Sequence, residues 1–362
     1  MAVGAGQQPA SMRAALRSGA QDFLDVNDSL ETAQQALSAM LNRRVVPPAG
    51  MALAPVTALV SARAGMGCSV LAAHLAWYLQ MQLARAQSPA GAAADGSEVG
   101  ASSLRAGAMS GDDERALEAL LIEVSQPGGD CAIYLNTPGE FRFADALHQR
   151  QRMDRRMAQI ALARHASGLR MLTQTHASLA GKGAQSAQDE QAVSGQCADL
   201  LQRLRTYFRH LLLDMGACDA QRPQSIDMLL AARDIWVVCD QSVASVVWTM
   251  ELLQQFDACS IPRDRMRLIV GRHDARIDLS AEQLAQQLRL PLLAVIPERR
   301  RELAQQLNQG ELLHPRQTRE PFVQAVSRLA SGLLAGHHPE LVQDSASSAS
   351  AWARLLARMT RH

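Results

Sequence analysis

The stretch that decides the fold runs Val56-Thr-Ala-Leu-Val-Ser-Ala-Arg-Ala-Gly-Met-Gly-Cys-Ser-Val70. Its apolar beginning, residues 56–60, predicts a buried strand, and the two glycines that follow predict a turn. Ser69 then opens a helix expected over Val70–Leu83. A strand, a glycine turn and a helix in this order direct backbone N–H groups and the positive end of the helix dipole at an anion. We therefore expect a phosphate-binding loop here; a purely structural turn is the alternative.

The chain after residue 50 repeats this alternation. Strands are expected at residues 56–60, 119–124, 169–172, 211–214, 235–239, 268–270 and 292–296. Helices are expected at residues 70–83, 198–208, 243–256, 281–288 and 321–334. Apolar strands that alternate with helices are typical of a parallel sheet covered on both faces. The sequence thus predicts an α/β fold with a mostly parallel, doubly wound sheet of about seven strands.

Composition excludes several classes of protein. The 362 residues include 36 Lys plus Arg and 35 Asp plus Glu, and Lys182, expected in a surface loop, is the single lysine. The formal net charge of +1 gives no reason to expect a nucleic-acid partner. No apolar run approaches ~18 residues and no secretory signal is present, so a cytoplasmic protein is expected. Six scattered cysteines without a CxxC pair favour reduced thiols over disulfides or a zinc site, and we expect no metal site built from them.

The phosphate-loop segment resembles the deviant Walker A loop of the MinD/ParA family of P-loop ATPases. The residues that the resemblance assigns to phosphate binding are Arg63, Gly65, Met66, Gly67, Cys68, Ser69 and Val70. Gly65, Gly67 and Ser69 match the family pattern. Arg63 stands where the family has the signature lysine that reaches across a dimer, and Cys68 replaces the lysine that neutralises the phosphates. The resemblance implies ATP and Mg²⁺ as cofactors, with weakened binding.

Three further positions bear on catalysis. Asp214, at the end of an apolar strand, resembles the Walker B carboxylate that holds Mg²⁺ through a water, and a loop-capping Asp is the alternative. Glu123 and Ser125 stand at the two positions of the family's Asp-x-Asp switch, and a serine cannot take a proton from water at neutral pH. Gly271 stands where the family has the Asn that reads adenine. These departures, with Cys68, predict a degenerate ATPase that hydrolyses ATP inefficiently, and no residue is assigned as catalytic.

Segments between the motifs resemble one branch of that family, the TadZ/CpaE proteins. They are Gly129-Asp-Cys-Ala-Ile-Tyr-Leu135, Arg152-Met-Asp154 and Ala163-Arg-His-Ala-Ser-Gly-Leu-Arg-Met-Leu172. The branch carries a receiver-like domain in front, and residues 12–24 resemble the last helix and strand of one, with a short strand near residues 20–26. We predict three parts: a truncated receiver-like tail and linker at 1–50, a MinD/ParA-like P-loop domain at 51–336 with a flexible insertion near 87–111, and a linker with an amphipathic helix at 337–362.

The resemblance implies a scaffold or localisation factor for a Flp/tight-adherence (type IVb) pilus secretion machine. Its implied partners are the secretion ATPase, the inner-membrane platform and a second copy of the chain, and its implied place is the cell pole or the inner membrane. The alternative is an active MinD/ParA-type ATPase that positions a flagellum, a cellulose synthase or the septum. A remote third reading, an iron–sulfur protein, would use Cys131 and Cys218.

The last dozen residues carry a second pattern. Trp352, Leu355, Leu356 and Met359 share one face of a predicted helix, and Arg354, Arg358 and Arg361 lie on the opposite face. A short basic amphipathic helix is typical of an interfacial membrane anchor. Docking on the same chain or on a protein partner is the alternative.

Overall fold

The computed structural model describes residues 2–4, 23–25, 27, 29, 53–87, 117–125, 129–174, 195–220, 222–313 and 319–338. The chain divides into two units, Met1–Ala52 and Leu53–His362. In the first unit, strands β1 (Ala2–Gly4) and β2 (Phe23–Asp25) pair in parallel, and β2 lies where the short strand was expected. The receiver-like character of this unit stays a prediction. The amphipathic tail and nearly all of the insertion lie outside the described residues.

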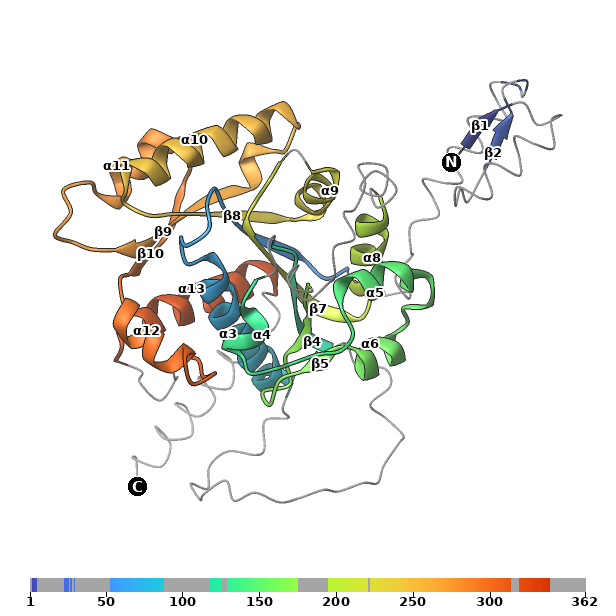
Figure 1. Cartoon of the computed structure of the whole chain (residues 1–362), viewed down its shortest axis with the longest axis horizontal. Helices are drawn as coiled ribbons and strands as arrows, with labels where there is room; N and C mark the ends of the chain where they lie inside the picture. Colours follow the sequence, from blue (N-terminus) through green and yellow to red (C-terminus); the bar gives the residue numbers. More distant parts are fainter. Residues whose placement is uncertain are drawn as a thin grey trace, which may run out of the picture. The chain divides into compact units, whose positions relative to one another are not determined.

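The second unit is built on an eight-stranded sheet in the order β10-β9-β8-β3-β7-β4-β6-β5 (Figure 1). The strands are β3 (Val56–Ser61), β4 (Leu117–Glu123), β5 (Ala163–Arg164), β6 (Arg170–Leu172), β7 (Phe208–Ala217), β8 (Asp234–Cys239), β9 (Met266–His273) and β10 (Leu292–Pro297). All neighbours pair in parallel except β5, which is antiparallel to β6. The predicted mostly parallel α/β sheet is confirmed, with β5 as the strand beyond the expected seven.

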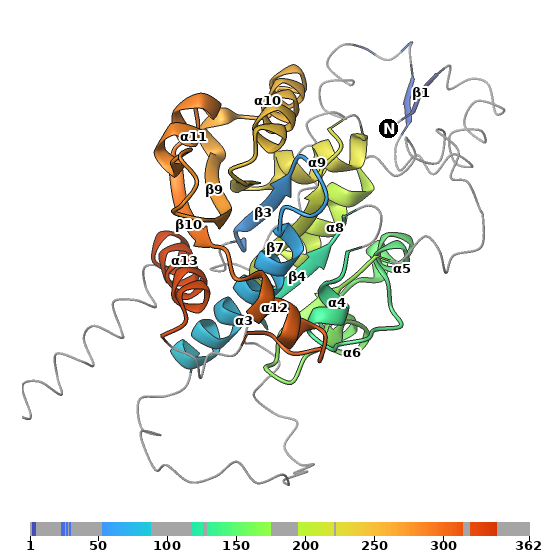
Figure 2. The same ribbon diagram turned by 60° about the vertical axis from the view of Figure 1, so that its left-hand side comes forward.

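Helices cover both faces of this sheet (Figures 1 and 2). They are α3 (Cys68–Gln87), α4 (Cys131–Tyr134), α5 (Phe143–His148), α6 (Arg155–Ala161), α8 (Gln196–Leu204), α9 (Pro223–Ala231), α10 (Val243–Ala258), α11 (Ala281–Leu288), α12 (Arg300–Leu307) and α13 (Pro321–His337), with 3-10 turns η1 (Arg150–Arg152) and η2 (Arg263–Arg265). Side chains of β3 alternate between two cores: Val56, Ala58 and Val60 pack with α8 to α11, and Leu59 packs with α3, α4 and α13. The doubly wound arrangement therefore follows from strands that are apolar on both sides.

Strand order brings the predicted functional positions together. The central strand β3 lies between β7 and β8, and β7 lies between β3 and β4. In register, Asp214 of β7 stands beside Leu59 of β3 on one side and beside Glu123 of β4 on the other. Because the three strands are parallel, the loop after β3 and both carboxylates meet at one edge of the sheet, where α/β folds bind ligands.

Boundaries differ from the sequence prediction where tertiary pairing overrides local periodicity. The helix expected at 198–208 ends at Leu204, because Phe208 pairs with Leu117 at the start of β7. The helix after the loop begins at Cys68, two residues earlier than expected, and α13 continues to His337, one residue beyond the predicted domain boundary at 336. Among the described helices, none combines the length and the apolar character needed to cross a membrane.

Candidate phosphate-loop site

The loop between β3 and α3 has the backbone of an anion site. Gly65 and Gly67 both have φ of +84°, which only glycine adopts without strain, and the space where each would carry a Cβ is open. Ser61 anchors the loop, since its single O–H lies within hydrogen-bond distance of two carbonyl oxygens, those of Arg63 (3.0 Å) and Gly216 (2.9 Å), and shares its proton between them. The 20-residue helix α3 starts directly after Gly67 and directs its dipole at the same space.

The side chain of Arg63 points toward α10. Its side chain is exposed, and the guanidinium carbon lies 5.8 Å from the ring centroid of Trp248, which is half-exposed on α10. Such a cation–π contact at an exposed site contributes about 0.5–1 kcal/mol, so it biases the side chain without locking it. Arg63 therefore lies toward α10, away from the interior of the loop.

Cys68 turns inward, against the strand-end carboxylate. Its side chain is buried and hydrogen-bonded to Asp214, and burial, followed by the charge of Asp214, raises the pKa of the thiol well above its usual range. At neutral pH it is thus a neutral thiol, and it supplies no positive charge for a phosphate. The residue that the resemblance assigns to the Walker lysine position thus faces the protein interior.

Asp214 is fully buried in a dense set of donors. The N–H of Gly216 donates to Oδ1 (3.1 Å), the thiol of Cys131 donates to Oδ2 (3.3 Å), and the side chain of Ser69 also hydrogen-bonds to it. Burial raises the pKa of Asp214, and these hydrogen bonds oppose that shift. Ser69 and Asp214 thus come together, as the resemblance to a Walker A and Walker B pair predicts.

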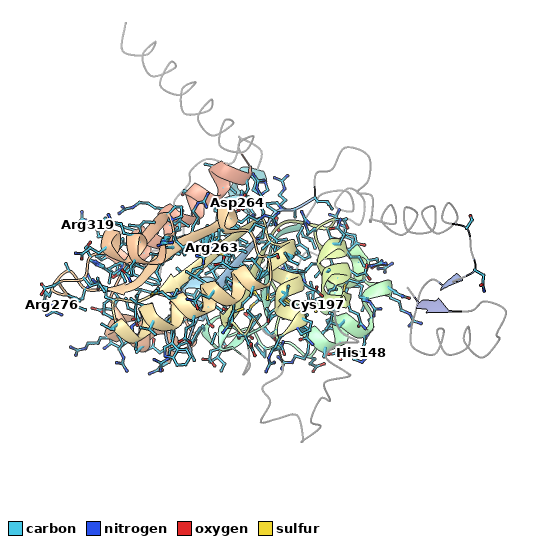
Figure 3. The ribbon with its side chains drawn as sticks, turned by 90° about the horizontal axis from the view of Figure 1, so that it is seen from above. His148, Cys197, Arg263, Asp264, Arg276 and Arg319 are labelled. Atoms are coloured by element: carbon cyan, nitrogen blue, oxygen red, sulfur yellow. The ribbon has the colours of Figure 1, made fainter. Side chains whose placement is uncertain are left out.

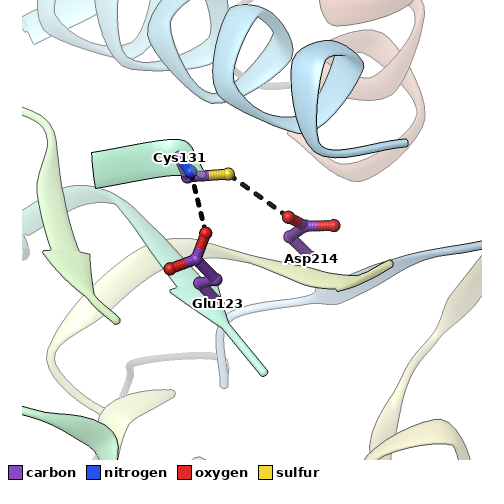
Figure 4. Close-up of side chains that lie close together, drawn as sticks. All are labelled: Glu123, Cys131 and Asp214. Atoms are coloured by element: carbon purple, nitrogen blue, oxygen red, sulfur yellow. Dashed lines mark hydrogen bonds between the residues drawn. The ribbon is translucent and has the colours of Figure 1, made fainter. Parts of the chain in front are cut away.

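Glu123 lies beside this set (Figure 4), and Ser125 follows it two residues later in the chain. The backbone N–H of Cys131 donates to Oε1 of Glu123 (2.8 Å), and burial raises the pKa of Glu123 to about 7. The Ser125 hydroxyl is buried and has no hydrogen-bond partner in the described part of the chain. Gly129 approaches both side chains so closely that a Cβ there would collide with the Glu123 carboxylate and the Ser125 hydroxyl.

A pocket of about 460 Å³ opens from the loop toward α12. Gly65, Met66 and Gly67 form one wall, and Leu303, Ala304 and Leu307 form the apolar far wall. Gly271 lines it, and a Cβ at 271 would stand 3.3 Å from the Met66 carbonyl oxygen and from Val238, a tight but not excluded contact.

Arg272 spans the edge of this pocket. Its Nη1 donates to the Gly65 carbonyl (2.7 Å), and its guanidinium pairs with Glu298 (3.3 Å) and Asp240 (3.7 Å). Its backbone has φ of +51°, a left-handed conformation that is uncommon outside glycine. Among the described residues, Arg272 is thus a cation in direct contact with the loop backbone. Its guanidinium already pairs with two carboxylates.

Comparisons with known proteins identify the architecture. No protein-family model and no curated protein sequence matches the chain. Among solved structures, the ParA family ATPase from Chlorobium tepidum TLS is similar over 76% of this chain and 98% of its own, with a TM-score of 0.58 and 17% identity. The MinD cell division protein of Aquifex aeolicus is similar over 78% of this chain and 98% of its own, with a TM-score of 0.53 and 16% identity. The chain has the ParA/MinD fold.

A third similar structure contains a ligand. The septum site-determining protein MinD from Pyrococcus horikoshii OT3, complexed with Mg-ADP, matches 78% of this chain and 96% of its own at a TM-score of 0.53 and 14% identity. At sequence identities this low, the structural similarity establishes the ParA/MinD fold alone. The chemistry has to be judged from the residues of this chain.

The structure brings most of the predicted site together. Gly65, Met66, Gly67 and Val70 line the pocket beside the loop, and Cys68 and Ser69 reach Asp214. Sequence reasoning missed Arg272 and the role of Cys131, which had been considered only as an iron–sulfur ligand. No spacing rule connects Cys131 with Asp214. The signal in the sequence is that Cys131 directly follows Gly129-Asp130, where a turn leads into a helix. The four tail residues from Trp352 to Met359 lie outside the described part.

Proposed function

We propose that this protein is a scaffold or localisation factor for a Flp/tight-adherence pilus secretion machine, built on the ParA/MinD fold, with weak or no ATP hydrolysis. The observation that carries the proposal is Cys68: a neutral thiol stands at the lysine position of the loop and packs against Asp214. The pilus assignment is supported by the TadZ/CpaE-like segments at 129–135, 152–154 and 163–172.

ATP and Mg²⁺ are the ligands that we propose for the loop. The features that fit them depend on backbone and shape: the two left-handed glycines, the start of α3, the Ser69 hydroxyl beside Asp214, and the 460 Å³ pocket for a base. Bound Mg²⁺ would neutralise phosphate charge, with Ser69 and Asp214 as the residues that hold it or its water. The residues themselves bind and orient the anion.

The groups needed for hydrolysis do not fit as well. Loss of one charge-assisted hydrogen bond, as at Cys68, costs about 1.5–3 kcal/mol. Ser125 lacks the basicity to take a proton from water, and Arg272 pairs with Glu298 and Asp240 and not with an open phosphate position. Since phosphoryl transfer relies on electrostatics and positioning, we derive no hydrolytic step for this site.

The proposed partners rest on the TadZ/CpaE-like segments. We propose the secretion ATPase and the inner-membrane platform of the pilus machine as direct partners, a homodimer as the working state, and a place at the pole or the inner membrane. Liposome co-sedimentation of the full chain, compared with a chain ending at Ser350, tests the membrane contact through the tail. Equal sedimentation of the two would contradict it.

The pilus role is tested in the organism that encodes the chain. Deletion of its gene should abolish Flp pili, and a tagged full-length chain should co-purify with the secretion ATPase of that machine. A deletion strain that assembles normal pili would exclude the proposed role. A chain that turns over ATP at the rate of an active ATPase would instead exclude the degenerate site and leave the pilus role to the deletion result.

A further inference from the structure

Three buried side chains at the edge of the sheet form a compact set of potential metal ligands (Figure 4). The carboxylates of Glu123 and Asp214 and the thiol of Cys131 offer three atoms that all lie within 4.8 Å of one another. The Cys131 Sγ and Asp214 Oδ2 atoms are 3.3 Å apart. In a tetrahedral zinc site, Zn–S of about 2.3 Å and Zn–O of about 2.0 Å place S and O about 3.5 Å apart. The Cys131 Sγ and Asp214 Oδ2 atoms are therefore close to coordination spacing, and the Glu123 oxygen lies within 4.8 Å of both.

The charge of this cluster is not compensated by basic residues. Within the described part of the chain, neither Glu123 nor Asp214 pairs with an arginine or a lysine, and their partners are backbone N–H groups, hydroxyls and thiols. Burying a carboxylate without a cation is costly, as the raised pKa values of both acids show, and either protonation or a bound divalent ion offsets that cost.

A second observation comes from Ser125. Its hydroxyl is 5% exposed and has no hydrogen-bond partner among the described residues. The point beside Gly129 where a Cβ would stand lies against this hydroxyl and against the Glu123 carboxylate, so both polar groups face the same small space. An unpartnered buried hydroxyl near the Glu123 carboxylate requires an explanation, and an ion or its water at this cluster supplies one.

The thiol decides which metal is expected. Mg²⁺ takes oxygen ligands in octahedral geometry and keeps several waters, whereas thiolate ligands select zinc-class ions. We propose that Glu123, Cys131 and Asp214 bind one Zn²⁺-class divalent ion, with a water in the fourth position. Binding breaks the S–H bond of Cys131, releases that proton to solvent and forms a sulfur–metal bond, without any change of oxidation state. The ion ties β4, β7 and α4 together. Asp214 is shared with the Mg²⁺ position proposed above, so the two ions compete for this carboxylate, and zinc binding requires neither ATP nor a pilus partner.

The test uses the full-length chain, purified under reducing conditions, stripped with a chelator and kept free of nucleotide. Zinc content after reloading and Co²⁺ absorption in the near ultraviolet are measured for the wild type and three variants. We expect one ion per chain and a thiolate-to-cobalt band in the wild type. Cys131→Ser and Glu123→Gln should weaken Zn²⁺ binding more than about 100-fold, since even second-shell losses cost 10- to 100-fold.

The matched control is Cys197→Ser. Cys197 lies on α8 (Figure 3), is as fully buried as Cys131, and packs in the core on the other face of the sheet. It should bind zinc like the wild type. Zinc that persists unchanged in Cys131→Ser, or a wild-type cobalt spectrum without a thiolate band, would overturn the proposal. Because the band needs no variant, misfolding of Cys131→Ser would not hide the answer, and ATP turnover does not enter it.

Discussion

The two ends of strand β7 solve the problem of buried polarity in different ways. At its start, His210 is fully buried, lies 3.0 Å from the Thr57 hydroxyl through Nε2, and stacks on His337 with ring centroids 5.3 Å apart. Burial, followed by the charges of His337 and His338, lowers the pKa of His210, so the imidazole is neutral at pH 7. At its end, Asp214 is equally buried but is an acid beside a second acid, Glu123.

The difference shows where a ligand is needed. A neutral imidazole needs no counter-ion: the Nε2 of His210 pairs with the Thr57 hydroxyl, and its Nδ1 has no hydrogen-bond partner among the described residues. Two acids that are buried to the same degree are costly to ionise. Hydrogen bonds from Gly216 and Cys131 reduce this cost only in part. The start of β7 thus carries no charge on its buried ring, and its acid end is the place where ions are expected to bind.

The largest effect is expected from crowding the acid end of β7. Gly216 has φ of +52°, and a Cβ there would stand 2.6 Å from the Cβ of Ser125. Gly216→Ala should lower the free energy of unfolding by about 2–4 kcal/mol through left-handed strain and overpacking. Urea denaturation measures this change.

Gly332→Ala is the control, because Gly332 lies in α13 with open space around its Cβ position. It should leave stability unchanged or raise it by up to about 1 kcal/mol. If the two alanine variants had equal stability, the acid end of β7 would not be tightly packed.

The second prediction concerns the buried neutral imidazoles. In α3, His74 accepts from the Leu313 N–H (3.0 Å) through Nε2, and burial lowers its pKa to about 4 from the usual 6.5. The unfolded chain binds the proton more readily, so stability is intact above pH 6.5 and is lost as pH falls toward 4. The loss from His74 alone amounts to about 3 kcal/mol.

Denaturation at pH 7 and at pH 4 should show this as a difference between the wild type and His74→Gln. In the variant, the pH dependence of the free energy of unfolding that comes from His210 remains, and the part that comes from His74 is lost. Exposed His148, in α5, serves as the control, and His148→Gln should follow the wild type. A wild-type slope that His74→Gln leaves untouched would contradict the neutral, buried state of this ring.

A smaller effect is expected at the start of β7. Thr57→Val removes the hydroxyl that satisfies His210 and should cost about 1–2 kcal/mol, because a buried ring nitrogen is left without a partner. In the background of His210→Leu the same change should cost about 1 kcal/mol less, since the orphaned group is gone. A double-mutant cycle of urea unfolding energies measures the coupling, and additive losses would contradict a specific pair.

Local patterns predicted much of this molecule. The strand, turn and helix around Gly65 and Gly67 are encoded within fifteen residues, and Asp214 follows an apolar strand, so each could be predicted without knowing its neighbours. What joins them is non-local. Cys131 meets Asp214 from a helix 83 residues earlier in the chain, and Cys68 meets the same carboxylate because β3 pairs with β7.

Other features of the structure cannot be predicted from the periodicity of the sequence. The motif assigns Arg63 to phosphate, which stays a prediction, and its contact with Trp248 of α10, far along the chain, could not be read from the motif. Arg272 has a left-handed backbone that no propensity predicts, and this conformation accompanies its contact with the Gly65 carbonyl. Phe208 fits a helical pattern, yet strand pairing with Leu117 decides its structure.

The most direct test of a ParA/MinD fold without efficient ATPase chemistry is the Mg²⁺-dependent ATP turnover of the purified full-length chain, measured beside Asp214→Ala. With a neutral thiol at position 68 and a serine at 125, the wild type should stay near the background rate, and Asp214→Ala should not differ from it. Robust Mg²⁺-dependent turnover that disappears in Asp214→Ala would contradict this conclusion and show that the site is a working ATPase.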